Sequence, residues 1–134
     1  MNMKKPELLI PAGDPETLRI AVIYGADAVY IGGRRYGLRS GAGNFSADEM
    51  REGVSFAHDH GCRVYVTANI FAHNADLNGI ADYFRELSGI GPDGLLISAP
   101  GVFDLAREHC PDIPVHISTQ ANNTNHGIYN FWYR

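Results

Sequence analysis

Five short apolar runs alternate with amphipathic helical stretches along this chain, and this alternation limits its fold more than any other feature. The apolar runs have the length of buried strands. They are Leu8–Ile10, Ala28–Ile31, Val64–Thr67, Leu95–Ile97 and Val115–Ser118. Strands separated by helices predict right-handed crossovers and a parallel sheet. The fold class is therefore α/β, as either a barrel or an open doubly wound sheet.

The turn after the first run favours the barrel. A dinucleotide-binding open sheet has a G-x-G-x-x-G turn there, whereas this chain has Pro11–Pro15. The segments Gly25–Ile31 and Gly91–Ile97 have similar sequences and are separated by two βα units. Such a repeat is expected when βα units of equal length follow one another along the chain. A complete barrel needs roughly 250 residues. We therefore predict a TIM-barrel-type parallel (β/α) fold of about the first five βα units, a partial barrel formed by residues 1–134 with no second domain.

Capping residues mark two helix starts, and aromatic residues crowd the end of the chain. Asp14 precedes Pro15, and Ser46–Glu49 has the S-x-x-E pattern of a capping box. The final seven residues include Ile128, Tyr129, Phe131, Trp132 and Tyr133. Apolar area left in water costs about 25 cal/mol per Å². We expect this cluster to be covered, either by further chain or by a second copy in a homo-oligomer.

Polar side chains occupy one face of the predicted sheet. A barrel sheet is buried on both faces, so polar residues of a single parity are informative. They are Tyr30, Tyr65, Thr67, Asn69, Ser98, His116, Ser118 and Gln120. We interpret this parity as facing the barrel interior. The polar residues lie toward the carboxyl ends of the strands, where barrel enzymes have their active sites.

The long loops at these carboxyl ends supply the candidate site. The segment Gly32–Phe45 has five glycines and three arginines, a composition that suits binding of a carboxylate or phosphate, although a solvated surface loop is the alternative. The candidate substrate-binding residues are Arg34, Arg39, Asn44, Asn69, His73, His116, Ser118, Gln120 and Asn122. The catalytic residues stay unassigned. Because His116 and Ser118 lie two apart on a strand, a direct hydrogen bond for a serine hydrolase dyad is awkward.

Charge and cysteine content exclude several classes of protein. The formal net charge of −4 does not favour broad non-specific binding to nucleic acid. No apolar run is long enough to span a membrane, and we expect no signal peptide at the start of the chain. Cys62 and Cys110 belong to no CxxC pattern, and we expect a cytoplasmic protein without a metal site in this segment.

Five motifs in order resemble the amino-terminal part of the collagenase-like peptidases, the U-32 family. They are Glu7–Gly13, Tyr24–Gly33, Arg39–Phe45, Val64–Asn69 and His116–Asn122. The resemblance covers about residues 6 to 133 and implies a barrel. It also implies an enzyme named as a peptidase or hydrolase, in a family whose other members hydroxylate tRNA, rRNA or ubiquinone precursors without oxygen. An iron–sulfur cluster in the full-length family protein is implied as well, although the family's cysteine-rich signature does not occur in this sequence.

Three hypotheses follow for what the chain does. The first is the amino-terminal segment of a U-32 enzyme that acts on a peptide, RNA or small anionic substrate. The second is a non-catalytic half-barrel that dimerises through its carboxyl-terminal aromatic cluster. The third is a binding module for RNA or a small anion.

Overall fold

Five parallel strands follow one another across a single sheet in the order of the chain, β1-β2-β3-β4-β5. The structure is a computed structural model that describes residues 3–37 and 44–133. The strands are β1 (Leu9–Pro11), β2 (Ala28–Gly32), β3 (Arg63–Ala68), β4 (Gly94–Ile97) and β5 (Val115–Ile117). The helices are α1 (Pro15–Ile23), α2 (Ala47–Asp59), α3 (Asn74–Ile90), α4 (Pro100–His109) and α5 (His126–Trp132), with a 3₁₀ turn at Thr119–Ala121. Each predicted strand is confirmed to within two residues.

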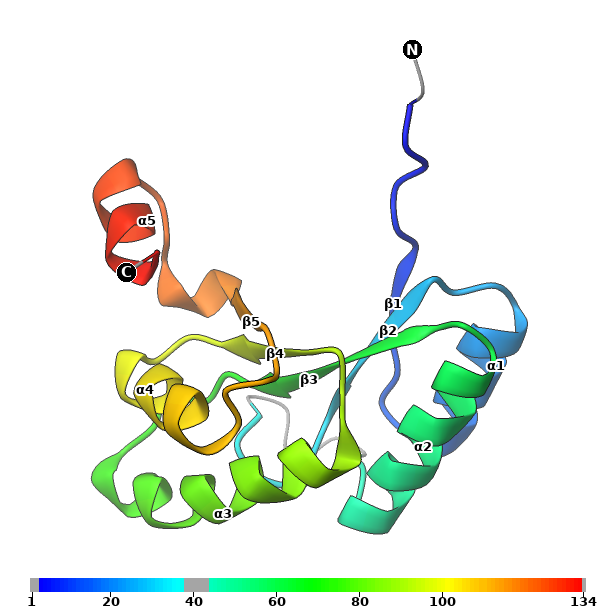
Figure 1. Cartoon of the computed structure of the whole chain (residues 1–134), viewed down its shortest axis with the longest axis horizontal. Coiled ribbons are helices and arrows are strands. Elements are labelled where there is room, and N and C mark those ends of the chain that lie inside the picture. The colour runs from blue at the N-terminus through cyan, green and yellow to red at the C-terminus, as the bar shows by residue number, and fades with distance from the viewer. Residues whose placement is uncertain (1–2, 38–43, 134) are drawn as a thin grey trace.

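Helices α1 to α4 lie together on one side of the sheet, and α5 lies apart from them beyond the end of β5 (Figure 1). The apolar parity of the strands faces the four helices: Val29, Val64, Val66, Leu95 and Ile97 are completely buried. Helix residues complete this core, namely Leu18, Val54, Ile80, Phe84, Leu87 and Val102. None of the helices in the described part of the chain is both long and apolar enough to cross a membrane.

The predicted helix caps are present. The Asp14 carboxylate accepts a hydrogen bond from the Thr17 backbone N–H at 2.8 Å, and this bond lowers the pKa of Asp14. At the start of α2, Ser46 Oγ accepts from the Glu49 N–H and Glu49 Oε2 accepts from the Ser46 N–H, at 3.2 and 2.8 Å. Two reciprocal bonds of this kind satisfy amide donors that the helix itself leaves unpaired.

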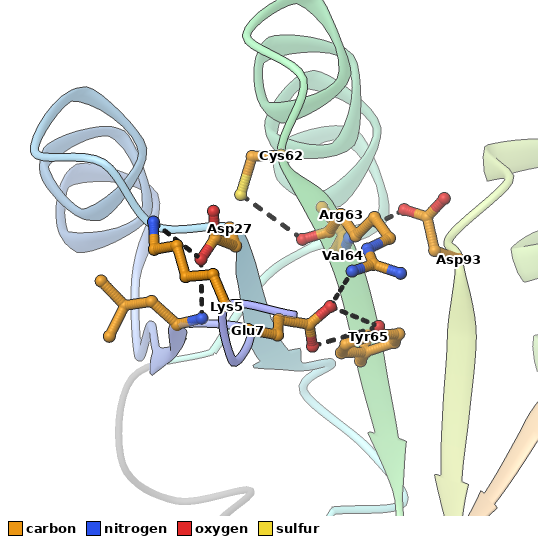
Figure 2. Close-up of polar contacts among 9 residues, drawn as sticks. Lys5, Glu7, Asp27, Cys62, Arg63, Val64, Tyr65 and Asp93 are labelled. Carbon is orange, nitrogen blue, oxygen red and sulfur yellow. Dashed lines mark hydrogen bonds and ion pairs between the residues drawn. The ribbon is translucent and has the colours of Figure 1, made fainter. Parts of the chain in front are cut away.

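The internal repeat is visible as a repeated contact at the amino ends of the strands (Figure 2). Asp27 Oδ2 accepts a hydrogen bond from the Leu8 N–H, and Asp93 Oδ2 accepts one from the Val64 N–H, both at 2.8 Å. In return, the Asp27 N–H donates to the Leu8 carbonyl and the Asp93 N–H to the Val64 carbonyl. Each aspartate therefore joins the strand that follows it to the preceding strand in the sheet, which explains the similar sequences.

A second polar cluster lies on the inner face at the same end. Arg63 forms an ion pair with Glu7, and the Tyr65 hydroxyl donates weakly to Glu7 at 3.3 Å (Figure 2). Burial first, and the nearby Glu7 carboxylate second, raise the pKa of Tyr65. The Tyr65 ring also lies against His116, with 5.0 Å between ring centroids. Tyr65 and His116 thus lie on the face opposite the helices, as their parity predicts.

Candidate functional site

A cavity of about 400 Å³ lies where the carboxyl ends of the strands meet. Such a position is where parallel barrels bind their substrates. Its walls come from strands β1 to β4 and from the segments that follow β1, β2, β3 and β5. The lining residues are Pro11, Ala12, Gly13, Tyr30, Ile31, Gly32, Gly37, Asn44, Thr67, Asn69, Leu96, Ser118, Thr119 and Gln120. Four of the predicted site residues are brought together here: Asn44, Asn69, Ser118 and Gln120.

Hydrogen bonds join three strand ends around this cavity. The Asn69 amide donates to Gln120 Oε1 at 3.3 Å, and the Ser118 hydroxyl donates to the same oxygen. The Ser98 hydroxyl donates to the Asn69 backbone carbonyl at 3.2 Å. These bonds connect β3, β4 and β5, so the amide groups at the cavity wall are held in fixed orientations before a ligand binds.

Tyr30 and Thr67 also line the cavity, although they were not among the candidate site residues. Their side chains share the inward parity with the predicted residues, and that parity was the signal that could have selected them. The Thr67 hydroxyl donates to the Ile31 carbonyl at 3.2 Å. Asn44 Oδ1 and Thr67 Oγ1 both lie close to Gly32. A Cβ added at Gly32 would be 3.1 Å from each of these oxygens.

The described lining is uncharged. It carries amides, hydroxyls and backbone groups, and Tyr30 is its one ionisable side chain among the described residues. Amides and hydroxyls both donate and accept hydrogen bonds, and Tyr30 and Leu96 add apolar surface. This combination suits a neutral, planar ligand with several polar atoms better than it suits an isolated charge.

Three other predicted residues lie away from the cavity wall. His116 is on the inner face of the sheet but contacts Tyr65. His73 is exposed at the start of α3, where its backbone N–H donates to Asp76. Asn122 is exposed after the 3₁₀ turn. Because the Ser118 hydroxyl donates to Gln120 while the His116 ring packs on Tyr65, the structure does not form a Ser118–His116 dyad.

The described arginines of the Gly32–Phe45 loop do not line the cavity. Arg34 and Arg35 are exposed and line a second hollow, of about 480 Å³, between this loop and helices α2 and α3. This hollow is on the outer, helical side, so Arg34 does not share the cavity with Asn44. Arg39 lies outside the described residues. A substrate-binding role for these arginines and for the other candidate residues stays a prediction.

The cysteines do not fit an iron–sulfur site. Cys62 directly precedes β3 and Cys110 ends α4, so both lie toward the amino ends of the strands. Both are buried with free thiols, and burial raises the pKa of each, to about 11 for Cys110. A cluster is held by several cysteine thiolates, whereas these two buried thiols lie toward the strand ends opposite the cavity.

Comparison with known proteins places this architecture in a family. Residues 13–134 match the sequence model of peptidase family U32. The chain belongs to peptidase family U32. The family resemblance read from the five sequence motifs is thereby confirmed.

The U32 relatives of this chain include RNA-modifying proteins. The tRNA hydroxylation protein P1 of Bacillus subtilis (strain 168) is 49% identical over 129 residues, which are 96% of this chain and 31% of that protein. The 23S rRNA 5-hydroxycytidine synthase of Escherichia coli (strain K12) is 39% identical over 116 residues, 87% of this chain and 17% of that protein. This chain therefore spans less than a third of either relative.

A solved structure supports the partial barrel. The structure of a U32 peptidase superimposes with a TM-score of 0.66 at 16% identity, over 90% of this chain and 53% of that chain. At that identity the likeness shows the fold alone. Together with the strand order, it confirms the predicted parallel α/β partial barrel.

Proposed function

We propose that this U32 chain binds the target nucleotide in an RNA-hydroxylating protein. The observation that carries the proposal is the 49% identity with a tRNA hydroxylation protein over 96% of this chain. A second relative acts on RNA according to its name, a 5-hydroxycytidine synthase of ribosomal RNA. The chain's own part in the reaction is recognition, because the groups that line its cavity bind and orient a ligand.

The chemistry of the cavity supports a nucleobase as the ligand. A base offers a flat apolar surface and an edge of donors and acceptors, which proteins read with amides, hydroxyls and aromatic rings. Asn69 and Gln120 provide amides, Thr67 a hydroxyl and Tyr30 a ring. The cavity volume of about 400 Å³ is within the range of small-ligand sites, roughly 300–1,000 Å³. A base inside an RNA fold must be turned outward to reach such a cavity.

A segment exchange tests the proposal. The matching 129 residues of Bacillus subtilis protein P1 are replaced by this chain, and the chimera is expressed in a strain that lacks its own tRNA hydroxylation proteins. We expect hydroxylated nucleoside to return in digests of total tRNA, measured by mass spectrometry, with intact P1 at equal abundance as the reference. A folded, abundant chimera that leaves tRNA unmodified would contradict the proposal.

One pair of asparagines tests the cavity itself. In the chimera, Asn69→Ala removes an amide of the cavity wall and leaves Gln120 with one donor fewer. We expect the rate of hydroxylation to fall roughly tenfold or more. A polar atom of the base that loses its partner in the binding site costs on the order of 1–3 kcal/mol. Asn78→Ala, on the exposed surface of α3, is the matched control and should leave the rate unchanged. Equal rates for the two variants would show that the cavity does not bind the substrate.

A further inference from the structure

Tyr36, in the loop after β2, adopts a backbone conformation that its residue type disfavours. Its φ angle is +64°, and the other described non-glycine residue with positive φ is Asn122. The left-handed region brings the Cβ of an L-residue against its own backbone, and asparagine tolerates it far better than tyrosine. Such a conformation persists only where surrounding contacts hold it.

The contacts that hold Tyr36 come from α3 and from the loop before it. The Tyr36 ring lies 5.2 Å from the Tyr83 ring, tilted by 43°. The Tyr36 hydroxyl lies so close to Gly79 that a Cβ added at Gly79 would be 2.2 Å from the oxygen. On the backbone side, the Tyr36 carbonyl accepts a hydrogen bond from the Ile70 N–H at 3.3 Å. Tyr36 is therefore held both through its ring and through its backbone.

Tyr83 holds the start of the same loop in a similar way. Its hydroxyl is fully buried and lies directly against the backbone of Gly33. Its oxygen would be 2.6 Å from a Cβ added at Gly33. Gly33 in turn bridges to Phe45, where the loop ends. Tyr83 and Gly33 therefore fit closely together where the loop begins.

We propose that Tyr36 is a positioning residue that fixes Gly37 in the wall of the cavity. Gly37 follows Tyr36 directly, is buried and lines the cavity beside Thr67. The two tyrosine–glycine contacts, Tyr36 with Gly79 and Tyr83 with Gly33, fasten the first part of the loop, Gly33–Gly37, to α3 on the outer side of the sheet. Packing on the helical side thereby sets the shape of the site on the other side. The expected effect of Tyr36 on hydroxylation rests on the proposed function, whereas its expected effect on the position of Gly37 does not.

Two glycines of one helix provide the test. Gly79→Ala introduces a methyl group that collides with the Tyr36 hydroxyl, whereas Gly89→Ala, also in α3, meets no atom within 4 Å. Both changes replace a glycine of the same helix with alanine, the residue of higher helix propensity. The double variant Gly79→Ala/Tyr36→Phe removes the colliding oxygen and leaves the nearest ring carbon, Cζ, at 3.5 Å, an ordinary contact. A purely structural defect of Gly79→Ala would not be repaired by removing one oxygen.

The first readout is nuclear Overhauser contacts in the chain as it stands. We expect the contacts between Tyr36 and Tyr83 and between Gly37 and Thr67 to be present in the parent chain and in Gly89→Ala. Both should be lost in Gly79→Ala and regained in the double variant. If the Gly37–Thr67 contact persists in Gly79→Ala after the Tyr36–Tyr83 contact is lost, the proposal is overturned.

The second readout is tRNA hydroxylation by the chimera. Misplacement of a binding wall by about 1 Å can cost up to about a hundredfold in rate, and we expect at least a fivefold to tenfold loss for Gly79→Ala on that basis. Gly89→Ala should match the parent, and the double variant should recover most of the rate. An unaltered rate in Gly79→Ala overturns the positioning role. If the parent chimera is itself inactive, the proposed function fails, and the contact readout alone decides on Tyr36.

Discussion

Cys110 packs at the end of α4, where 1% of its surface is exposed and burial raises the pKa of its thiol from 9.0 to about 11. At pH 8 this shift leaves about a hundredfold less thiolate than an exposed cysteine has. We expect Cys110 in a Cys62→Ala variant to react with a colorimetric disulfide reagent at least about tenfold faster in urea than in buffer. Equal rates would contradict the burial. Because the folded pKa is raised, the protonated thiol contributes stability fully below pH 9, and this contribution is lost as the pH rises toward 11.

At the same scale, Tyr36 shows where sequence reasoning reached its limit. The parity of the strands predicted that Asn69, Ser118 and Gln120 point into the barrel, because side chains alternate strictly along a strand. No comparable rule assigns a left-handed conformation to a tyrosine in a glycine-rich loop. The position of Arg34 in this loop was also not predictable. Arginine suits anion binding, but Arg34 lies on the outer side of the sheet. Residue type alone does not determine to which side a long loop turns.

At the scale of the elements, the repeated aspartates have the same contact but unequal surroundings. Asp93 accepts from the amide of Val64, which is completely buried, whereas Asp27 accepts from the amide of Leu8, which is 48% exposed. Water replaces the lost acceptor only at the exposed amide. We therefore expect Asp93→Ala to lower the free energy of unfolding by about 2 kcal/mol and Asp27→Ala by under about 1 kcal/mol.

Urea unfolding followed by circular dichroism measures both variants. Asp93 also forms a hydrogen bond with His58, with 2.7 Å between Oδ2 and Nε2, so His58→Ala serves as the control for that partly exposed contact. We expect His58→Ala to cost at most about 1 kcal/mol. Equal costs for the two aspartate variants would mean that burial of the amide does not govern the contact.

The element boundaries were largely predictable from the sequence, because each depends on a local signal. The capping box at Ser46 and the N-cap at Asp14 specify where α2 and α1 begin, and short apolar runs specify the strands. The contact of His116 with Tyr65 was not predictable, because it joins β3 and β5 across an intervening strand. Contacts of this kind depend on register, which local patterns do not specify.

At the scale of the whole molecule, the described sheet has two open edges and one uncovered face. Strands β1 and β5 each pair on one side only within the described residues. Leu9 on the inner face is 42% exposed, and Phe131 and Tyr133 of the carboxyl-terminal cluster are 54% and 80% exposed. Closed barrels have no open edges and bury their inner face. This chain covers 53% of the matched U32 structure, so that structure has further residues beyond the part that superimposes.

We therefore expect this chain to associate with the complementary part of a relative in preference to a second copy of itself. The part of Bacillus subtilis protein P1 that lies beyond the 129 matching residues is expressed together with this chain and purified through a tag on one component. Sedimentation should show a one-to-one complex, and fluorescence of a dye that binds exposed apolar surface should fall as the inner face is covered. Phe131→Ala should weaken the complex, whereas Phe71→Ala, which is also exposed but lies in the segment between β3 and α3, should not. A stable homodimer that excludes the complementary part would instead support coverage of the aromatic cluster by a second copy.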